Sequence, residues 1–281
     1  MQFDILLIPF IAIYYGIKQR IMKILVKFPT RGRSHFTRVL QRYQETRTTN
    51  DVHFLITIDK DDQVMNSAMQ LNLISLWGNQ TTQVIDPCGK IGAINYGVKE
   101  FYDTFQYDII VLASDDMNPN ITGWDQRIID DMTRLYPDTD GVLWYNDGHV
   151  GRQLNTMCIL GKKYFDRFGY IYQPDYKALW CDNEFMDVAE MLGKMTYSDD
   201  VIFEHQHPMW TTNQQDYLNV RDNGYYQTDK SIYEARKQRK FDLILNTDTN
   251  HKQPKESVQQ APKSDKPANR KGRPRKQSTS L

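Results

Sequence analysis

The chain contains the stretch Met22-Lys-Ile-Leu-Val-Lys-Phe-Pro-Thr30-Arg31-Gly32-Arg33, a short apolar run followed by a basic turn. Residues 23–28 form an apolar run that predicts a β-strand, and a proline ends it. Residues 34–45 follow with apolar side chains at helical spacing, which predicts a helix that packs by one face. We therefore expect a folded domain to begin near Met22 with a strand and a helix.

The same alternation continues along the chain. Apolar runs at 52–58, 82–85 and 108–113 predict three further strands, and 62–76 and 90–102 predict the helices between them. Repeated strand–helix units form a mostly parallel sheet with helices on both faces. The predicted fold class is therefore α/β, a three-layer α/β/α sandwich with a mostly parallel central sheet.

The second half of the chain is less regular. We expect helices over 121–135, 162–168, 181–192 and 228–245, and strands over 141–145, 157–160 and 201–204. A polar loop that contains Asp147 follows the first of these strands, and the last strand runs into His205-Gln206-His207.

Polar residues follow each of the first four predicted strands. They are Arg31 and Arg33, then Asp59, then Asp86, and finally Asp115 with Asp116. In open α/β sheets, ligands bind beyond the carboxyl ends of the strands. A single residue of this kind can equally cap the helix that follows it, but four strand ends that meet at one edge favour a binding site.

The Asp115-Asp116 pair ends an apolar strand, where two adjacent negative charges are unfavourable unless a cation offsets them. Carboxylate oxygens favour Mg²⁺ or Mn²⁺, which commonly bridge one or two carboxylates to substrate phosphates. A metal ion bound to a diphosphate makes that diphosphate a better leaving group. The alternative is that the pair caps the helix predicted over 121–135.

Several other classes are disfavoured by missing motifs. The chain has no G-x-G-x-x-G after its first strand, no G-x-x-x-x-G-K-[ST] and no G-x-S-x-G, which argues against a dinucleotide cofactor, a P-loop and a serine nucleophile elbow. Its three cysteines have no C-x-x-C spacing, which argues against a zinc site or a disulfide framework and fits a reducing compartment. We expect a cytoplasmic protein.

Taken in order, these features resemble the GT-A fold glycosyltransferases, especially the family-2-like enzymes. The resemblance runs from Met22 to Pro208. The stretch 89–97, Gly-Lys-Ile-Gly-Ala-Ile-Asn-Tyr-Gly, is similar to the family's G-K-x-x-A-x-N-x-G helix, and Ser114-Asp115-Asp116 stands where the family has D-x-D. The departure from the family pattern is Ser114, which replaces the first acid.

The resemblance implies a donor site and a metal site. It places Asp59 on the nucleoside base and makes Asp116 a direct metal ligand. It also implies a histidine ligand, His205 or His207, although each could instead be an ordinary strand residue. The metal would be Mn²⁺ or Mg²⁺. The expected donor-nucleotide contacts are Thr30, Arg31, Arg33, Asp59, Lys90, Asn95 and Asp115.

By the same resemblance, Trp180-x-Asp182-Asn183-Glu184 corresponds to the family's second acidic motif, at the start of an acceptor-side helix. In an inverting enzyme one of these carboxylates would take the proton from the acceptor hydroxyl, and Asp182 and Glu184 stay equal candidates. Acids at a helix N-terminus can also be simple caps. Asp147 and Trp180 are expected on the acceptor side.

The two ends of the chain differ from its centre. Residues 1–21 are an apolar extension that is short for a membrane span, so it is either dispensable, an interfacial or partner helix, or an anchor. Residues 22–246 are the predicted domain, and 247–281 a disordered tail. Residues 251–281 have a net charge of about +7, against about −7 for the other 250 residues. The tail's Arg270-Lys-Gly-Arg-Pro-Arg-Lys276 resembles an AT-hook, which suggests DNA as a partner; a generic basic tail or a localisation signal is the alternative.

The sequence therefore predicts a metal-dependent glycosyltransferase that moves a hexose from a nucleotide-sugar donor, UDP-linked, to an unidentified acceptor. The alternatives are a nucleotidyltransferase, which also uses carboxylates and a metal on a nucleotide, and a non-catalytic module that binds sugar or nucleic acid. A nucleotidyltransferase would want a glycine-rich basic loop after the first strand, where this chain has one glycine between two arginines.

Overall fold

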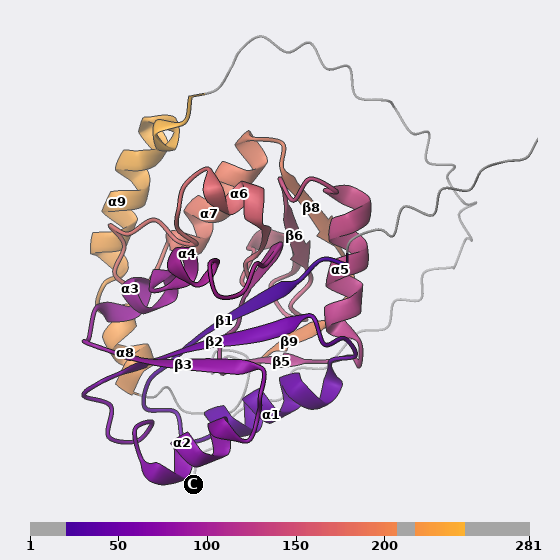
Figure 1. Ribbon diagram of the computed structural model, residues 1–281. Coiled ribbons are helices and arrows are strands. Elements are labelled where there is room, and N and C mark those ends of the chain that lie inside the picture. Colours follow the sequence, from indigo (N-terminus) through magenta and orange to yellow (C-terminus); the bar gives the residue numbers. More distant parts are fainter. Residues whose placement is uncertain (1–20, 207–216, 245–281) are drawn as a thin grey trace, which may run out of the picture. The chain divides into compact units, whose positions relative to one another are not determined.

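The computed structural model describes residues 21–206 and 217–244, and its main feature is a mixed sheet (Figure 1). Within these residues seven strands pair in the order β3-β2-β1-β4-β7-β6-β8. Strands β1 to β4 are parallel to one another, β7 is antiparallel to β4 and β6, and β6 is parallel to β8. The bounds are β1 Ile24–Thr30, β2 Val52–Asp59, β3 Gln80–Ile85, β4 Ile109–Leu112, β6 Val142–Tyr145, β7 Ile159–Gly161 and β8 Met195–Ser198.

Helices cover both faces of this sheet, which confirms the predicted three-layer α/β class. Helices α1 (Phe36–Thr46), α2 (Ala68–Ser75) and α5 (Trp124–Leu135) share one apolar core with the sheet. The other core contains side chains of α3 (Gly89–Asn95), α4 (Val98–Phe101), α6 (Lys162–Asp166), α7 (Cys181–Met191) and α9 (Tyr226–Gln238). The remaining helical elements are α8 (Tyr217–Asn223), η1 (Gly151–Gln153) and η2 (Lys240–Asp242).

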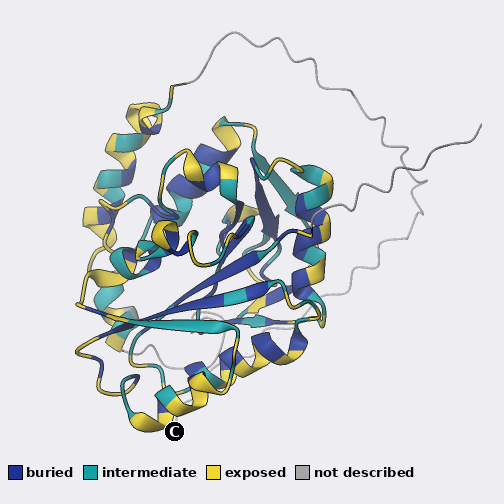
Figure 2. Ribbon diagram, viewed as in Figure 1, coloured by how far each residue is buried: buried dark blue, intermediate teal, exposed yellow. Residues whose placement is uncertain are grey.

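The central strand β1 serves both cores because successive strand residues point to opposite faces. Ile24, Val26 and Phe28 pack toward α1 and α5, whereas Leu25 packs toward α3 and α4. Figure 2 shows this strand and its neighbour β2 as almost wholly buried. Lys27 lies on the α3 side of β1 and is also fully buried, an exception in an otherwise apolar strand.

Several predicted helices have different bounds from those expected. The helix expected from residue 62 begins only at Ala68, because the Asp62 carboxylate accepts the backbone N–H groups of Val64 and Met65 and forms a turn. The helix expected over 90–102 is two helices, divided at Gly97, whose φ of 72° lies in the left-handed region. The helix expected over 228–245 runs over Tyr226–Gln238.

A second, two-stranded sheet lies next to the end of β4. It pairs β5 (Met117–Pro119) with β9 (Phe203–His205) in antiparallel orientation, with Met117 opposite His205. Because β5 follows Asp116 at once and the N-cap of α5 is Gly123, the alternative in which Asp115 and Asp116 cap that helix is wrong.

Buried aspartates hold several of the connecting segments. Asp125, with no exposed surface, accepts the backbone N–H groups of Thr48 and Thr49. Asp229 is equally buried and accepts three backbone N–H groups of residues 177–179 just before α7. Charge-assisted bonds of this kind fix loops firmly, so the segments around the site are held without disulfides. None of the described helices is both long and apolar enough to cross a membrane.

Candidate active site

One edge of the sheet gathers the polar residues that follow the strands. Strands β1, β2, β4 and β6 run in the same direction, so their carboxyl ends meet there, followed by Arg31, Asp59, Asp115 and Asp147. Asp86 follows β3, but its side chain is 89% exposed and lies 3.7 Å from the Lys60 amine. The site therefore centres on β1, β2 and β4 rather than on β3.

The β1 and β2 ends are joined by ion pairs. The Arg31 guanidinium donates to Asp59 at 2.6 Å and to both oxygens of Asp61 at 2.6 and 2.9 Å. The backbone N–H of Gly32 donates to Asp62 at 2.6 Å. This leaves the other oxygen of Asp59 buried with no hydrogen-bond partner, and the Thr30 hydroxyl is in the same state. Buried polar atoms are rarely left unpaired, so both atoms are suited to contact a ligand.

Asp115 is held from the α1 side of the site. Its carboxylate lies 3.7 Å from Arg33 Nε, and both side chains are largely buried. The ring of His35 bonds the backbone of Asp115, and burial together with the charge of Arg33 lowers the pKa of His35. His35 belongs to none of the motifs in the sequence, although its place two residues after Arg33 is a signal for this site.

Asp116 lies in a chain of polar contacts. It accepts a short hydrogen bond from the Ser114 hydroxyl, and its other oxygen is 3.6 Å from His205 Nε2. The opposite ring nitrogen of His205 is 3.3 Å from Asp147. Burial opposes a charge on His205, but the carboxylates of Asp116 and Asp147 outweigh it and raise the pKa of His205. The β5–β9 pairing brings these residues together from distant parts of the chain.

The predicted metal site is incomplete in protein ligands alone. Among residues 21–206 and 217–244, no group of three or more His, Cys, Asp or Glu side chains could hold a metal ion. Asp116 and His205 supply one oxygen and one nitrogen that face each other, which fits a metal ion that takes its other ligands from phosphates and water. The second predicted histidine, His207, lies outside the described residues.

Asp147 and Trp180 both have partners within the fold. One oxygen of Asp147 accepts the backbone N–H groups of residues 149–151 and the other accepts the Thr156 hydroxyl, so the residue holds its own loop. Trp180 has a φ of 62° and packs on Tyr226 and Tyr233, with ring centroids 5.5 and 5.1 Å away. These contacts hold both residues within the fold, and acceptor contact by either residue stays a prediction.

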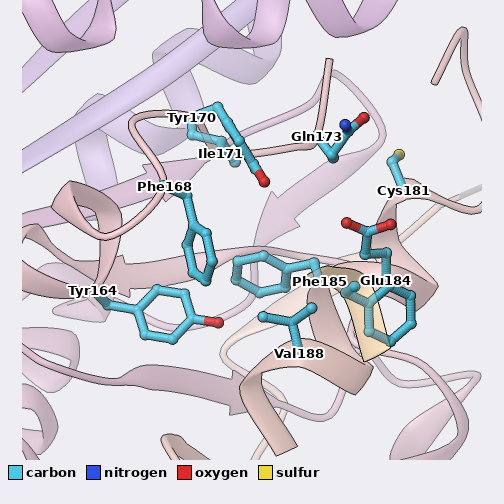
Figure 3. A pocket seen from close by; sticks show the side chains of 10 residues that line it. Tyr164, Phe168, Tyr170, Ile171, Gln173, Cys181, Glu184, Phe185 and Val188 are labelled. Carbon is cyan, nitrogen blue, oxygen red and sulfur yellow. The ribbon is translucent and has the colours of Figure 1, made fainter. Parts of the chain in front are cut away.

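The two acidic residues that open α7 have different surroundings. Glu184 is 4% exposed, binds Arg236 at 2.8 to 3.1 Å through both oxygens, and accepts the Tyr176 hydroxyl at 2.7 Å. Figure 3 shows its carboxylate beside an aromatic cavity that includes Phe185 and Tyr164. That cavity has a volume of about 20 Å³, room for about one water molecule, and so it is not a sugar site.

Asp182 is the better candidate for a base. Its carboxylate accepts the adjacent backbone N–H of Asn183, at 2.9 Å. Burial raises the pKa of Asp182, while the charges of Lys90 and His205 act in the opposite direction. These charges connect Asp182 with the donor side, where Lys90 also pairs with Asp222 of α8 at 3.4 Å.

Asn95 is occupied by the backbone. Its amide nitrogen donates to the carbonyl of Tyr172 at 2.6 Å, and its oxygen accepts the N–H groups of Ile171 and Tyr172 at 2.9 and 3.1 Å. A nucleotide contact by Asn95 would have to compete with these bonds. The geometry thus gives Asn95 a part in joining α3 to the segment before α7, and a direct donor contact stays a prediction.

The sheet order and the helices on both faces belong to an α/β fold of the GT-A type, as the likeness to solved structures shows. Among solved structures, the mannosyltransferase PcManGT from Pyrobaculum calidifontis, in complex with GDP-Man and Mn²⁺, matches with a TM-score of 0.55 and 12% identity. The match covers 76% of this chain and 64% of that protein.

TarS from S. aureus matches with a TM-score of 0.52 and 10% identity over 66% of this chain and 37% of TarS. Its 1–349 fragment with UDP-GlcNAc gives a TM-score of 0.52 and 12% identity over 70% and 60% of the two chains. At these identities the likeness establishes the fold. Neither the family models nor the curated proteins give a match to this sequence.

Proposed function

We propose that this protein is a glycosyltransferase that moves a hexose from a nucleotide-sugar donor to an acceptor hydroxyl. The observation that carries the proposal is the grouping of three features near one sheet edge: the unpaired oxygen of Asp59, the Asp116–His205 pair and the partly buried carboxylate of Asp182. They would serve the nucleoside, the diphosphate and the acceptor in that order. The fold shared with PcManGT and TarS supports this assignment.

Asp116 and His205 would hold a divalent metal, Mn²⁺ or Mg²⁺. When bound, the metal supplies positive charge that stabilises the departing nucleoside diphosphate. The protein's own contribution is to hold the two ligands: Ser114 donates to Asp116, and Asp147 bonds the ring nitrogen of His205 that faces away from Asp116. Such outer contacts orient a histidine ligand and select its tautomer.

Asp182 would accept the proton of the attacking hydroxyl, which implies an inverting reaction. Its raised pKa suits a general base, because a carboxylate with a pKa nearer the working pH is a stronger base. Lys90, which is predicted to contact the donor, pairs with Asp222 and its charge opposes the rise in the pKa of Asp182.

The donor is proposed to be UDP-linked, and the unpaired oxygen of Asp59 would accept the ring N–H of uracil, as it would that of guanine. The test is nucleotide release from UDP-glucose, UDP-N-acetylglucosamine and GDP-mannose in the presence of Mn²⁺. The proposal expects release of UDP from at least one donor and its loss in Asp116→Ala. Release of GDP alone would reject the UDP assignment, and no release from any donor together with no nucleotide binding would reject the function.

A further inference from the structure

A lysine side chain lies inside the molecule, in the central strand of the sheet. Lys27 stands between Val26 and Phe28 in β1, and none of its surface is exposed. Its side chain extends into the α3 side of the sheet, where Leu25, Leu55 and Ile110 are among the apolar strand residues. Burying an amine is unfavourable unless its hydrogen bonds are made, so this position requires an explanation.

The Lys27 amine joins three elements. It donates a short hydrogen bond to the Thr57 hydroxyl of β2 and a second one, of 2.8 Å, to the backbone carbonyl of Tyr96. Tyr96 is the residue at which α3 ends, just before the left-handed Gly97. Lys27 therefore ties the C-terminal end of α3 to the middle of the sheet.

Helix α3 in turn contacts both halves of the site. Lys90, in its first turn, pairs with Asp222 and acts on the carboxylate of Asp182. At its other end, Asn95 holds the backbone of Ile171 and Tyr172, in the segment that precedes α7. A shift of α3 would therefore displace a predicted donor contact and the approach to the candidate base together.

We propose that Lys27 is a positioning residue for the active site, which fixes α3 against β1 and β2 and thereby sets the location of Lys90 and of the segment before α7. This inference rests on the proposed function, because it takes this edge of the sheet to be the donor site. Stability alone does not explain the residue, since replacing a buried charged group by a hydrocarbon of similar volume is often neutral or stabilising. Stability given up at one position commonly serves activity.

The principal test is Lys27→Met, which keeps the unbranched side chain and removes the donors. We expect an unchanged or higher unfolding temperature, and a dissociation constant for UDP with Mn²⁺ that rises about 10- to 100-fold, the effect of a misplaced contact. Thr57→Val removes the hydroxyl partner and should act in the same direction with a smaller effect. Lys23→Met is the matched control and should leave UDP binding unchanged, because Lys23 precedes the first residue of β1 and its amine lies over the Phe105 ring.

A second readout is the pH dependence of stability. Burial lowers the pKa of Lys27 from 10.5 to about 7, while the neighbouring Cys88 thiol, itself near Asp59, acts in the opposite direction. Because the folded-state pKa of the amine is depressed, the unfolded chain binds the extra proton between these values, and stability rises with pH there. The wild type should therefore gain stability relative to Lys27→Met from about pH 7 to about pH 10, a window set by the two pKa values.

The outcomes separate the inference from the function on which it rests. If the wild type binds UDP and both Lys27→Met and Thr57→Val bind it equally well, the positioning role is overturned and the function stands. A lower unfolding temperature with unchanged UDP binding would also overturn it, as a purely structural role. If Lys27→Met fails to fold, UDP binding by Thr57→Val decides. If the wild type binds neither UDP nor GDP, the proposed function fails and the inference fails with it.

Discussion

Asp182 and Glu184 lie two positions apart at the start of α7, yet their side chains have different surroundings. Glu184 is neutralised by Arg236, whereas the pKa of Asp182 is raised by burial. The sequence gives both residues equal standing, because Arg236 follows 52 positions later and nothing local marks it as the partner of either acid. The structure therefore separates two candidates that a motif alone leaves equal.

Replacing Asp182 by Asn tests its role as the base. We expect kcat to fall by about 10²–10⁴-fold, the usual contribution of a general base, with the dissociation constant for UDP nearly unchanged. In the wild type, activity should decline as the pH falls through the raised pKa of Asp182, because the base must be unprotonated. Glu190→Gln, on the exposed face of the same helix, is the control. A full kcat in Asp182→Asn would remove the residue from the reaction.

At the scale of elements, α7 depends on α9 for its position. The Arg236–Glu184 pair, with side chains 12% and 6% exposed, joins the two helices, and Asp187 adds a bond from the Tyr233 hydroxyl at 2.6 Å. Asp229, near the start of α9, holds the backbone of residues 177–179 that lead into α7. Helix α9 therefore supports the helix that carries the candidate base.

Loss of the Arg236–Glu184 pair should lower the stability of the fold. Arg236→Met leaves the Glu184 carboxylate buried without its cation, which is expected to lower the free energy of unfolding by about 3–5 kcal/mol. Arg239→Met, at a side chain 54% exposed, should change it by less than about 0.5 kcal/mol. Urea unfolding measures both, and adding Glu184→Gln to Arg236→Met should recover part of the loss. Equal, small effects of the two arginine variants would contradict a supporting role for α9.

The elements that sequence patterns predict best are those with local signals. Strands β1, β2 and β4 are mostly apolar runs; Asp59 ends β2, and Asp116 follows shortly after β4. The β5–β9 pairing is different, because each strand has only three residues and they lie far apart in the chain. The approach of His205 to Asp116 depends on that pairing and could be expected only from the resemblance to a family.

Lys27 is a residue whose strand is predicted correctly but whose buried amine is not. The run Ile-Leu-Val-Lys-Phe predicts a strand correctly, and the same run hides a buried amine within it. A lysine among buried strand residues could have been noted as an exception to the pattern. Its partners, Thr57 and the carbonyl of Tyr96, come from the non-local packing of α3 on the sheet.

At the scale of the whole molecule, the charge is divided between the body and the tail. Residues 251–281 carry nine Lys and Arg and two Asp and Glu, a net charge of about +7, and lie outside the described residues. We propose that this tail tethers the enzyme to DNA, which raises the concentration of DNA-borne acceptors near the site.

A comparison of the full chain with one that ends at Asn246 tests the tether. Binding to A·T-rich and G·C-rich duplexes should be measured across a salt series, since the slope reports the number of phosphate contacts. We expect the truncated protein to lose binding, and the full chain to prefer A·T-rich DNA. Equal affinity for both duplexes would reduce the tail to general electrostatic attraction, and undiminished binding after truncation would remove the tail from DNA recognition.

The central claim is that the sheet edge at Asp116 is a metal-dependent nucleotide site, and calorimetric titration with UDP tests it most directly. The wild type should bind UDP with Mn²⁺ and more weakly with the chelator EDTA, Asp116→Ala should bind with the same weak affinity in either condition, and Asp86→Ala, which removes an exposed acid after β3, should behave as wild type. Wild-type binding of UDP that is indifferent to Mn²⁺, or full Mn²⁺-dependent binding in Asp116→Ala, would contradict the account.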